Sequence, residues 1–433
     1  MAIQSLVIIL IVLLALLALG VPIAYSIGIS ALVVILQTVP LDVSVVTAAQ
    51  RIFVGMSKFS LTAIPFFILA GNLMNQGGIA KRLVDFVMAI LGKLPGALLV
   101  TNAGANALFG AISGSASAAA AAVGSMVREG EEEQGYDPAL CAATNGASAP
   151  SGLLIPPSNA LITYSLASGG TSVAALFLGG YIPGFLWALC CIIVGVILAK
   201  RKGYRGTEGK FDWKNLGTAT IRAIPALSLI VIVIGGIVSG IFTATEGSAI
   251  AVAYALVLGV LYRNITLKSF WKIVVESAKM SGMVVFLIGT SNILGWVMAF
   301  LQIPQAVSAA LLGLTDNYVV ILLIMNVILL IAGTFMDVTP AILIFTPLFL
   351  PIVKTFGMHP VHFGLILVYN LCIGNITPPV GNTLFVAIKV GGTTLAKTIP
   401  YMVWYYIAIL IGLLLVTYVP FLSTGLPIAA GLI

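Results

Sequence analysis

The sequence predicts an all-α polytopic membrane protein, built as two inverted repeats that each contain a re-entrant helical hairpin and a broken helix. The first observation is composition, because 60% of the 433 residues are hydrophobic and only 8% are charged, against about a quarter in a soluble domain. The second is a stretch of 24 residues that recurs 222 positions later, and the third is a proline pair in each copy.

The repeated stretch begins at Gly135 and returns without a gap at Gly357. Because proline lacks an N–H and clashes with the preceding turn, its proline pairs do not fit a regular helix. Freed carbonyl groups at membrane depth are tolerated only inside protein or beside a water-filled cavity. Matched interruptions predict the substrate and ion site of a transporter, and prolines that only kink buried helices are the alternative. The recurring positions are Gly135, Pro138, Gly152, Pro156 and Pro157, which return as Gly357, Pro360, Gly374, Pro378 and Pro379.

The first repeat is predicted over residues 1–199. Two apolar segments in succession at its start indicate a membrane span rather than a cleaved signal peptide. Residues 42–60 are typical of an amphipathic helix along the interface, since Arg51 and Lys58 stand among apolar residues. The expected order is spans at 1–19 and 21–39, this amphipathic arm, a span at 61–75, a hairpin at about 94–127, a broken helix at 139–166 and a span at 173–199.

The first hairpin is predicted from GAISGSASAAAAAVGS at residues 110–125. Small residues let two backbones approach closely, and a tip near Ser113, Gly114 and Ser115 exposes hydroxyl and peptide groups. An ordinary packing helix rich in small residues is the alternative. The polar run that follows, 128–134, is expected to be a solvated loop.

A hydrophilic linker, 200–222, separates the first repeat from the second repeat at 223–433. The second repeat is expected to follow the same order. Its elements are spans at 223–241 and 247–262, an amphipathic arm at 264–279, a span at 281–301, a hairpin at about 318–353 with a polar tip at 333–337, a broken helix at 361–388 and a span at 400–419.

The positive charges predict the orientation. Each half has five expected crossings, and an odd number forces the second half to be inverted. With both termini outside, in the periplasm, seventeen of the 20 Lys and Arg residues fall on the cytoplasmic side, where such residues concentrate. The excess of basic residues is therefore explained by membrane topology and does not require a nucleic-acid partner. The three exceptions are Arg51, Lys58 and Lys354.

Each hairpin tip precedes the helix break of its own repeat by a similar distance, since Ser113 lies 39 residues before Gly152 and Gly333 lies 41 before Gly374. An alkali cation in a membrane requires several oxygen ligands, which unwound carbonyls and hydroxyls supply without burying a carboxylate. We therefore predict two cation sites. The first consists of Ser113, Ser115, Gly152, Ile155 and Pro157, and the second of Gly333, Gly374, Thr377 and Val380.

The ends of the half-helices favour an anionic substrate, because helix N-termini carry partial positive charge. A carboxylate is the natural candidate. Asp337 could cap the next helix or bind a cation or proton. No nucleotide-binding loop, nucleophile–base arrangement or metal-ligand spacing is visible, so we expect neither an ATPase nor an enzyme, and no cofactor. Candidate neutral donors, each of which could instead bind a neighbouring helix, are Asn145, Asn159, Thr334 and Asn382.

Several motifs resemble the large membrane subunit of the tripartite ATP-independent periplasmic (TRAP) transporters over the whole chain. They are LGVPIA at 19–24, IPFFILAGNLM at 64–74, GAISGSASAAAAAVGS at 110–125, GLLIPPSN at 152–159 and NITPPVGN at 375–382.

The resemblance implies a sodium-coupled importer in the bacterial inner membrane that receives a carboxylate from a periplasmic binding protein. It also implies a separate small four-helix membrane subunit and an elevator movement of the hairpin-bearing domain. The family's sodium positions fall on the residues of the two predicted cation sites.

The first hairpin departs from the family, because residues 118–122 are all alanine where many members carry an acidic or hydroxyl residue. The resemblance therefore leaves C4-dicarboxylates, sugar acids and keto acids open. A stand-alone sodium or proton/carboxylate symporter of the same architecture is the alternative. The absence of paired catalytic groups disfavours an intramembrane enzyme or a purely structural scaffold.

Overall fold

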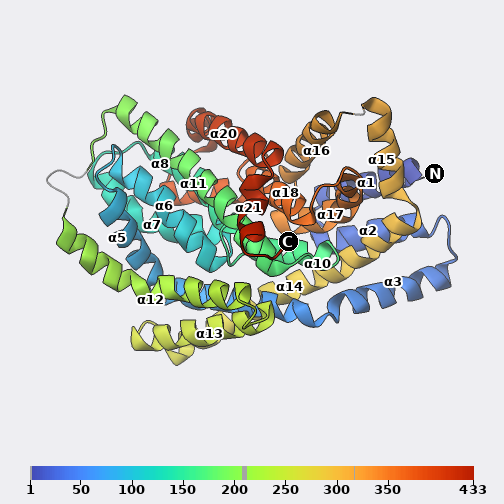
Figure 1. Cartoon of the computed structure of the whole chain (residues 1–433), viewed down its shortest axis with the longest axis horizontal. Helices are drawn as coiled ribbons and strands as arrows, with labels where there is room; N and C mark the ends of the chain where they lie inside the picture. The colour runs from blue at the N-terminus through green and yellow to red at the C-terminus, as the bar shows by residue number, and fades with distance from the viewer. Residues whose placement is uncertain (1, 207–211, 316) are drawn as a thin grey trace.

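The computed structural model describes residues 2–206, 212–315 and 317–433, and every regular element in these ranges is a helix (Figure 1). The first half contains α1 (Ala2–Ala18), α2 (Ile23–Ile35), α3 (Leu41–Met56), η1 (Phe59–Thr62), α4 (Ala63–Gln76), α5 (Ile79–Leu91), α6 (Ala97–Ser113), α7 (Ala116–Glu133), α8 (Pro138–Ser148), α9 (Ser151–Leu154), α10 (Asn159–Ala167) and α11 (Val173–Lys202). The second half contains α12 (Trp213–Val238), α13 (Ala244–Leu261), α14 (Leu267–Phe300), α15 (Ile303–Leu314), α16 (Tyr318–Gly333), α17 (Val338–Thr355), α18 (Pro360–Gly374), α19 (Asn382–Gly391), α20 (Leu395–Tyr418) and α21 (Phe421–Ala429).

The order of helices is the same in both halves. Helices α1 and α2 correspond to α12 and α13, α3 with α4 to α14, α5 to α15, and α11 to α20. The hairpin helices α6 and α7 correspond to α16 and α17, and the broken helix α8–α10 corresponds to α18 and α19. The two hairpins lie toward opposite ends of the long axis (Figure 1). The predicted helical fold with two hairpins and two broken helices is confirmed.

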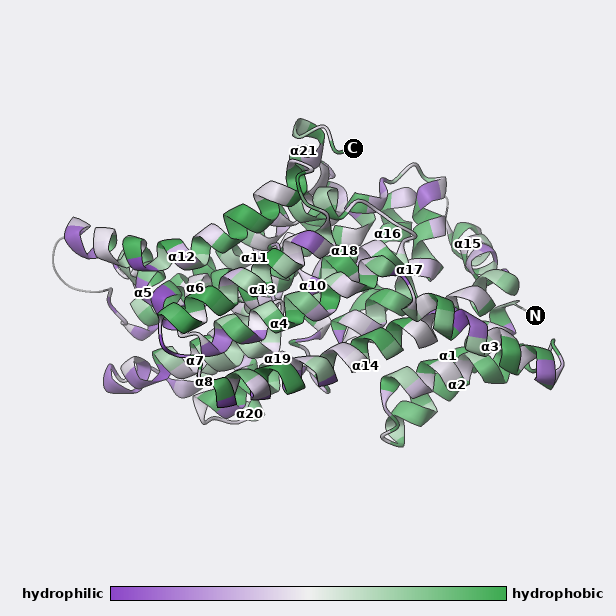
Figure 2. Ribbon diagram, turned by 90° about the horizontal axis from the view of Figure 1, so that it is seen from below, coloured by the Kyte–Doolittle hydropathy of each residue, from purple (hydrophilic) through white to green (hydrophobic). Residues whose placement is uncertain are grey.

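Six of the described helices are long and apolar enough to cross a membrane, or seven if the bent pair α3 and α4 counts as one span. Hydrophobic residues cover most of the helices, and hydrophilic residues gather mainly near helix ends (Figure 2). The distribution is that of a multi-pass membrane protein.

Both broken helices begin with the same local signals. Asp137 precedes Pro138 and caps α8, because its Oδ1 accepts the Ala139 N–H at 2.9 Å. His359 precedes Pro360 and caps α18, because its Nδ1 accepts the Val361 N–H at 3.2 Å. A side-chain acceptor satisfies one free N–H of the first turn, and a proline at the first helical position has no N–H to leave unpaired. The repeated sequence therefore fixes where each broken helix starts.

Helix α14 runs without interruption for 34 residues through the predicted arm 264–279 and span 281–301. In the first half, by contrast, α3 and α4 are bent by 58°. Pro65 stands in the first turn of α4, where its ring and its missing N–H disfavour a helix that continues from the preceding residues, whereas α14 contains no proline. The structure thus corrects the break expected near residue 280.

Helices α5 and α15 were not predicted from the sequence. In α5 the charged residues Lys81, Arg82 and Asp85 interrupt the apolar pattern, although one face of the helix buries Leu83 and Val87. Helix α5 packs between α12 and α6, and α15 packs between α1 and α17. Each of these helices therefore lies between the first span of one repeat and a hairpin helix.

The helices pack as two groups. The scaffold group comprises α1–α4 and α12–α14, which contact one another extensively. The hairpin group comprises α6–α11 and α16–α21 and contains both hairpins and both broken helices. The groups meet along a seam where α4 and α14 face α6, α10 and α17. The seam is where the candidate site lies.

The polar run 128–134 is not the solvated loop that was expected, because α7 continues through it to Glu133. Glu131 in this run is only 7% exposed, and its Oε1 has no hydrogen-bond partner among the described residues. Desolvation raises the pKa of the Glu131 carboxyl to about 7, an effect that the Cys141 thiol and the Arg128 guanidinium partly offset. Glu131 is thus a buried group at the polar end of the first hairpin.

This environment predicts a stability that falls as the pH rises. The folded-state pKa lies above the ordinary value of 4.5, so the protonated carboxyl stabilises the fold and that contribution is lost as the pH passes through about 7. We expect a loss of about 1 kcal/mol between pH 6 and pH 8, seen as a lower melting temperature in detergent. Glu131→Gln should remove this pH dependence, while Glu133→Gln at an exposed position should keep it. A Glu131→Gln protein with the original pH dependence would contradict the assignment.

Candidate functional site

The two helix breaks release backbone carbonyls at matching places. Pro156 offers no N–H to the Gly152 carbonyl, and Pro157 offers none to the Leu153 carbonyl. The Ser158 hydroxyl donates to the Leu153 oxygen instead. In both proline pairs the peptide bond between the prolines is cis. No group in the described part of the chain donates a hydrogen bond to the Gly152 oxygen.

Six of the predicted cation ligands have bare carbonyls, by which we mean oxygens that accept no hydrogen bond within the described residues. They are the oxygens of Gly152, Ile155 and Pro157 in the first break, and of Gly333, Thr377 and Val380 at the second. Gly152, Ile155 and Gly333 are buried residues, and a buried carbonyl without a partner costs free energy unless water or a bound species replaces the missing donor. Val380, in contrast, is 38% exposed. The Gly374 oxygen differs, because it accepts the Thr377 N–H at 2.9 Å.

A glycine contact joins each hairpin to the break of its own repeat. A Cβ atom built on Gly152 would lie closer than 3.0 Å to backbone atoms of Gly110, and one on Gly374 would lie closer than 3.0 Å to backbone atoms of Gly333. Only glycine allows this approach, since backbone cannot move aside cheaply. Gly110 was not predicted, and its equivalence to Gly333 could have indicated it.

The tip of the first hairpin consists of Gly114 and Ser115, between the end of α6 and the start of α7. The Ser115 hydroxyl accepts the Ala118 N–H at 3.3 Å and so caps α7. The Ser113 hydroxyl donates to the Ser115 carbonyl at 3.3 Å. Gly114 has φ of +63°, which glycine adopts without strain. The predicted serine ligands therefore lie together at the tip.

The tip of the second hairpin runs from Thr334 to Asp337. Asp337 caps α17, because its Oδ1 accepts the Val338 N–H at 2.9 Å. The Thr334 hydroxyl donates to the Ile331 carbonyl at 2.7 Å, and the Thr334 carbonyl accepts the Val380 N–H at 3.3 Å. The second tip is thus bonded directly to the second break.

A cavity of about 260 Å³ lies in the seam between the two groups of helices. Both hairpin tips, α10, α4 and α14 form its walls, and Ser113, Ser115, Asn159 and Asp337 are the predicted residues that line it. Its lining contains one ionisable side chain, Asp337. The two hairpins lie toward opposite ends of the molecule (Figure 1), and residues at both of their tips line the cavity.

The cavity also has polar walls that the sequence did not indicate. Asn72 and Asn75 on α4 and Asn375 at the second break line it. The amide oxygens of Asn159 and Asn375 are buried and have no hydrogen-bond partner among the described residues. Such orphaned acceptors next to a cavity require a donor from water or a ligand. The sequence alone does not indicate whether a single Asn in an apolar segment lines a cavity.

Three of the predicted substrate residues do not line the cavity. Asn145 is buried and already hydrogen-bonded within the protein, since its Nδ2 donates to the Ala120 carbonyl at 2.8 Å and its Oδ1 accepts from Asn106 at 2.9 Å. Thr334 faces the second break, and Asn382 is exposed at the start of α19. Their proximity to the prolines in sequence was not sufficient to place them at the cavity.

Buried amides hold each hairpin to its broken helix. The Asn106 amide on α6 donates to the Ser148 hydroxyl at 2.9 Å, and the Asn370 amide on α18 donates to the Asn326 oxygen on α16 at 2.9 Å. Such interhelical bonds in a bilayer contribute about 0.6 kcal/mol each on average. They fix the position of the bare carbonyls relative to the tips.

The chemistry of the site is that of neutral oxygen ligands. No group of three or more His, Cys, Asp or Glu residues that could hold a metal ion occurs in the described part of the chain. Carbonyl and hydroxyl oxygens are the ligands that hard cations of low charge prefer, and transition metals prefer nitrogen or sulfur. The arrangement therefore offers the type of ligand that an alkali cation requires, in the same part of the molecule as a polar cavity.

Comparison with known proteins identifies the family of the chain. The family model of the tripartite ATP-independent periplasmic transporter, DctM component, matches residues 10–422. An uncharacterised protein of Salmonella typhimurium, YgiK, is 49% identical and covers 95% of this chain and 94% of its own. The isethionate TRAP transporter permease DctMQ of Oleidesulfovibrio alaskensis is 41% identical over 93% of this chain and 63% of its own. The C4-dicarboxylate large permease DctM of Pseudomonas aeruginosa is 38% identical over 93% of each chain.

A solved structure shares the fold. The YdaH transporter of Alcanivorax borkumensis covers 86% of this chain and 87% of its own with a TM-score of 0.58, at 17% sequence identity. At that identity the likeness concerns architecture alone. Sequence, helix order and family match agree, and the chain belongs to the DctM family, the large permease subunits of TRAP transporters.

Proposed function

We propose that this permease subunit belongs to a sodium-coupled importer of a small organic acid, which is delivered by a periplasmic binding protein. In this proposal a separate small membrane subunit completes the transporter in the bacterial inner membrane, and both termini face the periplasm. The observation that supports it best is the presence of two sets of bare carbonyls at the helix breaks, whose neighbours Leu153, Asn159 and Asn375 line one polar cavity. The relatives named for isethionate and C4-dicarboxylates support a small organic anion as substrate.

Sodium coupling is supported by the ligand chemistry. A cation that binds Gly152, Ile155 and Pro157 would satisfy three bare oxygens at the first break, and Gly333, Thr377 and Val380 would do the same at the second. Binding would hold hairpin tip and helix break together through the contacts of Gly110 with Gly152 and of Gly333 with Gly374. Coupling requires that the cation bind the substrate-loaded state more tightly than the empty one.

An elevator movement is supported by the division into two groups of helices. The cavity lies on the seam, where the hairpin group meets α4 and α14 of the scaffold group. Helices α5 and α15 contact both groups and would bend or tilt as the hairpin group moves. Both bare-carbonyl sets belong to the hairpin group, so cations and substrate would move together.

An acidic substrate is compatible with the cavity through helix ends rather than basic side chains. Ser115, Ser158 and Asp337 cap helices α7, α10 and α17, and the first turns of these three helices line the cavity. Partial positive charge at these ends favours a carboxylate. A cation or proton beside Asp337 would offset the repulsion between its carboxylate and the substrate.

Reconstitution into proteoliposomes tests the proposal. Uptake of an organic acid should require a sodium gradient, the small subunit and a loaded binding protein. Sodium-driven uptake by the large chain alone would instead support the stand-alone symporter. Candidate acids are best found by a thermal-shift screen of the binding protein with C4-dicarboxylates, sugar acids, keto acids and isethionate.

Two substitutions separate sodium coupling from proton coupling. With sodium as the driving ion, Ser113→Ala should raise the sodium concentration for half-maximal uptake about tenfold, because one oxygen ligand is lost at a cost of about 1 kcal/mol or more. With protons as the driving ion, Asp337→Asn should abolish uptake while Ser113→Ala changes little. The measurement is the initial rate of uptake against sodium concentration at fixed pH and against pH at fixed sodium.

A further inference from the structure

Two adjoining hollows lie in the same seam and share Lys58, Leu166 and Gly169. Their volumes are about 310 and 290 Å³. We call them together the basic vestibule, because Arg51 and Lys58 line them and no acidic residue does. Helix α3, the segment after it, the end of α10 and helices α14 and α17 form its walls.

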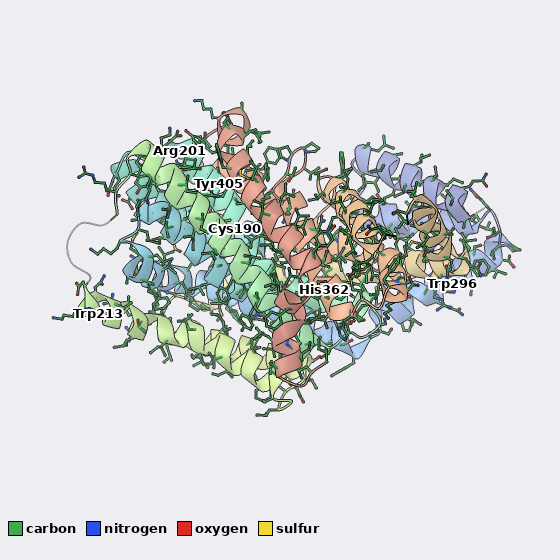
Figure 3. The ribbon with its side chains drawn as sticks, turned by 45° about the horizontal axis from the view of Figure 1, so that its top comes forward. Cys190, Arg201, Trp213, Trp296, His362 and Tyr405 are labelled. Atoms are coloured by element: carbon green, nitrogen blue, oxygen red, sulfur yellow. The ribbon has the colours of Figure 1, made fainter. Side chains whose placement is uncertain are left out.

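The basic vestibule lies next to the central cavity, displaced along α14 and α17, which line both hollows. On α14 the cavity touches Val284, and the vestibule begins one turn later at Ile288. On α17 the cavity touches Thr339, and the vestibule begins one turn later at Leu343. One turn of helix advances about 5.4 Å, so the hollows succeed each other along one seam. The vestibule lies toward the end of α14 where Trp296 stands, far from Arg201 and Trp213 (Figure 3).

Both cations of the vestibule are available to a ligand. The Arg51 guanidinium carbon lies 5.2 Å from the centre of the Trp296 ring, a cation–π contact, and its N–H groups donate no hydrogen bond to another described residue. The Lys58 ammonium has no hydrogen bond or ion pair within the described part of the chain. They are two of the three basic residues that the charge distribution places on the outer side.

A third group points to a ligand independently of charge. Ser291 lines the vestibule and is 5% exposed, and its hydroxyl has no hydrogen-bond partner among the described residues. A buried hydroxyl without a partner is unfavourable unless water or a ligand binds it. Asn292 lies beside it in the same wall. Cations and neutral donors together are the groups that bind a carboxylate.

We propose that the basic vestibule is the first binding site for the carboxylate of the transported acid, on the outer side of the central cavity. This inference rests on the proposed function. Solvent screens an ion pair at exposed side chains, so the vestibule holds the acid briefly and mainly increases its local concentration and rate of arrival. The central cavity has no basic residue, so the acid leaves the cations behind when the hairpin tips bind it.

Iodide quenching of Trp296 fluorescence tests the vestibule without any transport. The signal of Trp296 is the difference between the full chain and its Trp296→Phe variant, both in lipid nanodiscs. In the Arg51→Gln/Lys58→Gln protein, iodide quenching should fall about twofold or more because the local anion concentration falls, while quenching by neutral acrylamide stays the same. Lys354→Gln removes the third outer basic residue, which lines neither hollow, and should change nothing. Equal iodide quenching in the double variant would overturn the proposal.

Protection experiments identify the anion. Succinate should suppress iodide quenching of Trp296 at a lower concentration than chloride at equal ionic strength, and the double variant should lose this difference. If sn-glycerol 3-phosphate protects and succinate does no better than chloride, the vestibule binds lipid headgroups and the proposed role is wrong.

Transport then separates this inference from the proposed function. At low ionic strength the double variant should have kcat/KM for the acid about tenfold lower, with kcat unchanged, and the difference should shrink at high salt. Equal kcat/KM in both proteins would refute the vestibule and leave the transporter intact. If no acid is transported although succinate protects Trp296, the proposed function fails and the anion site stands.

Discussion

Replacing Gly374 with alanine is expected to abolish sodium-dependent uptake and to lower the melting temperature of the protein. The added Cβ would lie closer than 3.0 Å to three backbone atoms of Gly333, and backbone at the end of α16 cannot move without displacing the hairpin tip. Overpacking of this kind costs about 1–3 kcal/mol. The added methyl group should also push the bare carbonyl of Gly333 away from those of Thr377 and Val380. Gly152→Ala should act in the same way through Gly110.

The measurements are initial uptake rates in proteoliposomes and melting temperatures with and without sodium chloride. Gly282→Ala is the matched control, since Gly282 lies within α14 and a Cβ there would meet nothing within 4 Å. A Gly374→Ala protein with normal uptake and an unchanged sodium concentration for half-maximal rate would show that the second break does not hold the cation.

Replacing both Pro156 and Pro157 with alanine is expected to remove the stabilisation by sodium while the sodium-free protein stays folded. Alanine supplies N–H groups that can bond to the carbonyls of Gly152 and Leu153, so one of the oxygens assigned to the first cation becomes occupied. A ligand at 100 times its dissociation constant stabilises a protein by about 2.7 kcal/mol, so the loss is large enough to measure. The two glycine variants add volume to the site, whereas this variant changes hydrogen bonding.

The readout is the shift of the melting temperature with sodium, with potassium as the comparison salt. Pro225→Ala is the control, because Pro225 lies inside α12 of the scaffold group and lines neither the cavity nor a break. If the alanine pair leaves the sodium-induced shift intact, peptide oxygens at the first break are not the ligands.

The sequence predicted the parts of the site that depend on proline and glycine. These residues act through their own backbone, so the repeat of Gly152 and Pro156 as Gly374 and Pro378 was sufficient to locate both breaks. Gly110 was missed because a glycine within a run of small residues looks the same whether it packs against a backbone or not. Its role depends on Gly152, which lies 42 residues away.

Features that depend on distant partners could not be predicted. Asn106 and Asn326 are single polar residues in apolar helices, and nothing local indicates that they bind Ser148 and Asn370. Glu131 belongs to a polar run that any local criterion assigns to solvent, but the packing of α7 buries it. The charged first turns of α14 likewise suggested a separate helix, although α14 continues through them without a break.

The bare carbonyls have a consequence for energetics across the bilayer. Peptide oxygens neutralise none of the charge of the ion they bind, so in the proposed mechanism each sodium ion would keep its positive charge inside the hairpin group, and only the carboxylate of the substrate would offset it. A membrane potential that is negative inside would pull the loaded protein inward where the bound cations outnumber the carboxylates, by about 2.3 kcal/mol per net charge per 100 mV for passage through the whole field. Voltage would then contribute to accumulation in proportion to that excess, even where the sodium concentrations on the two sides are equal.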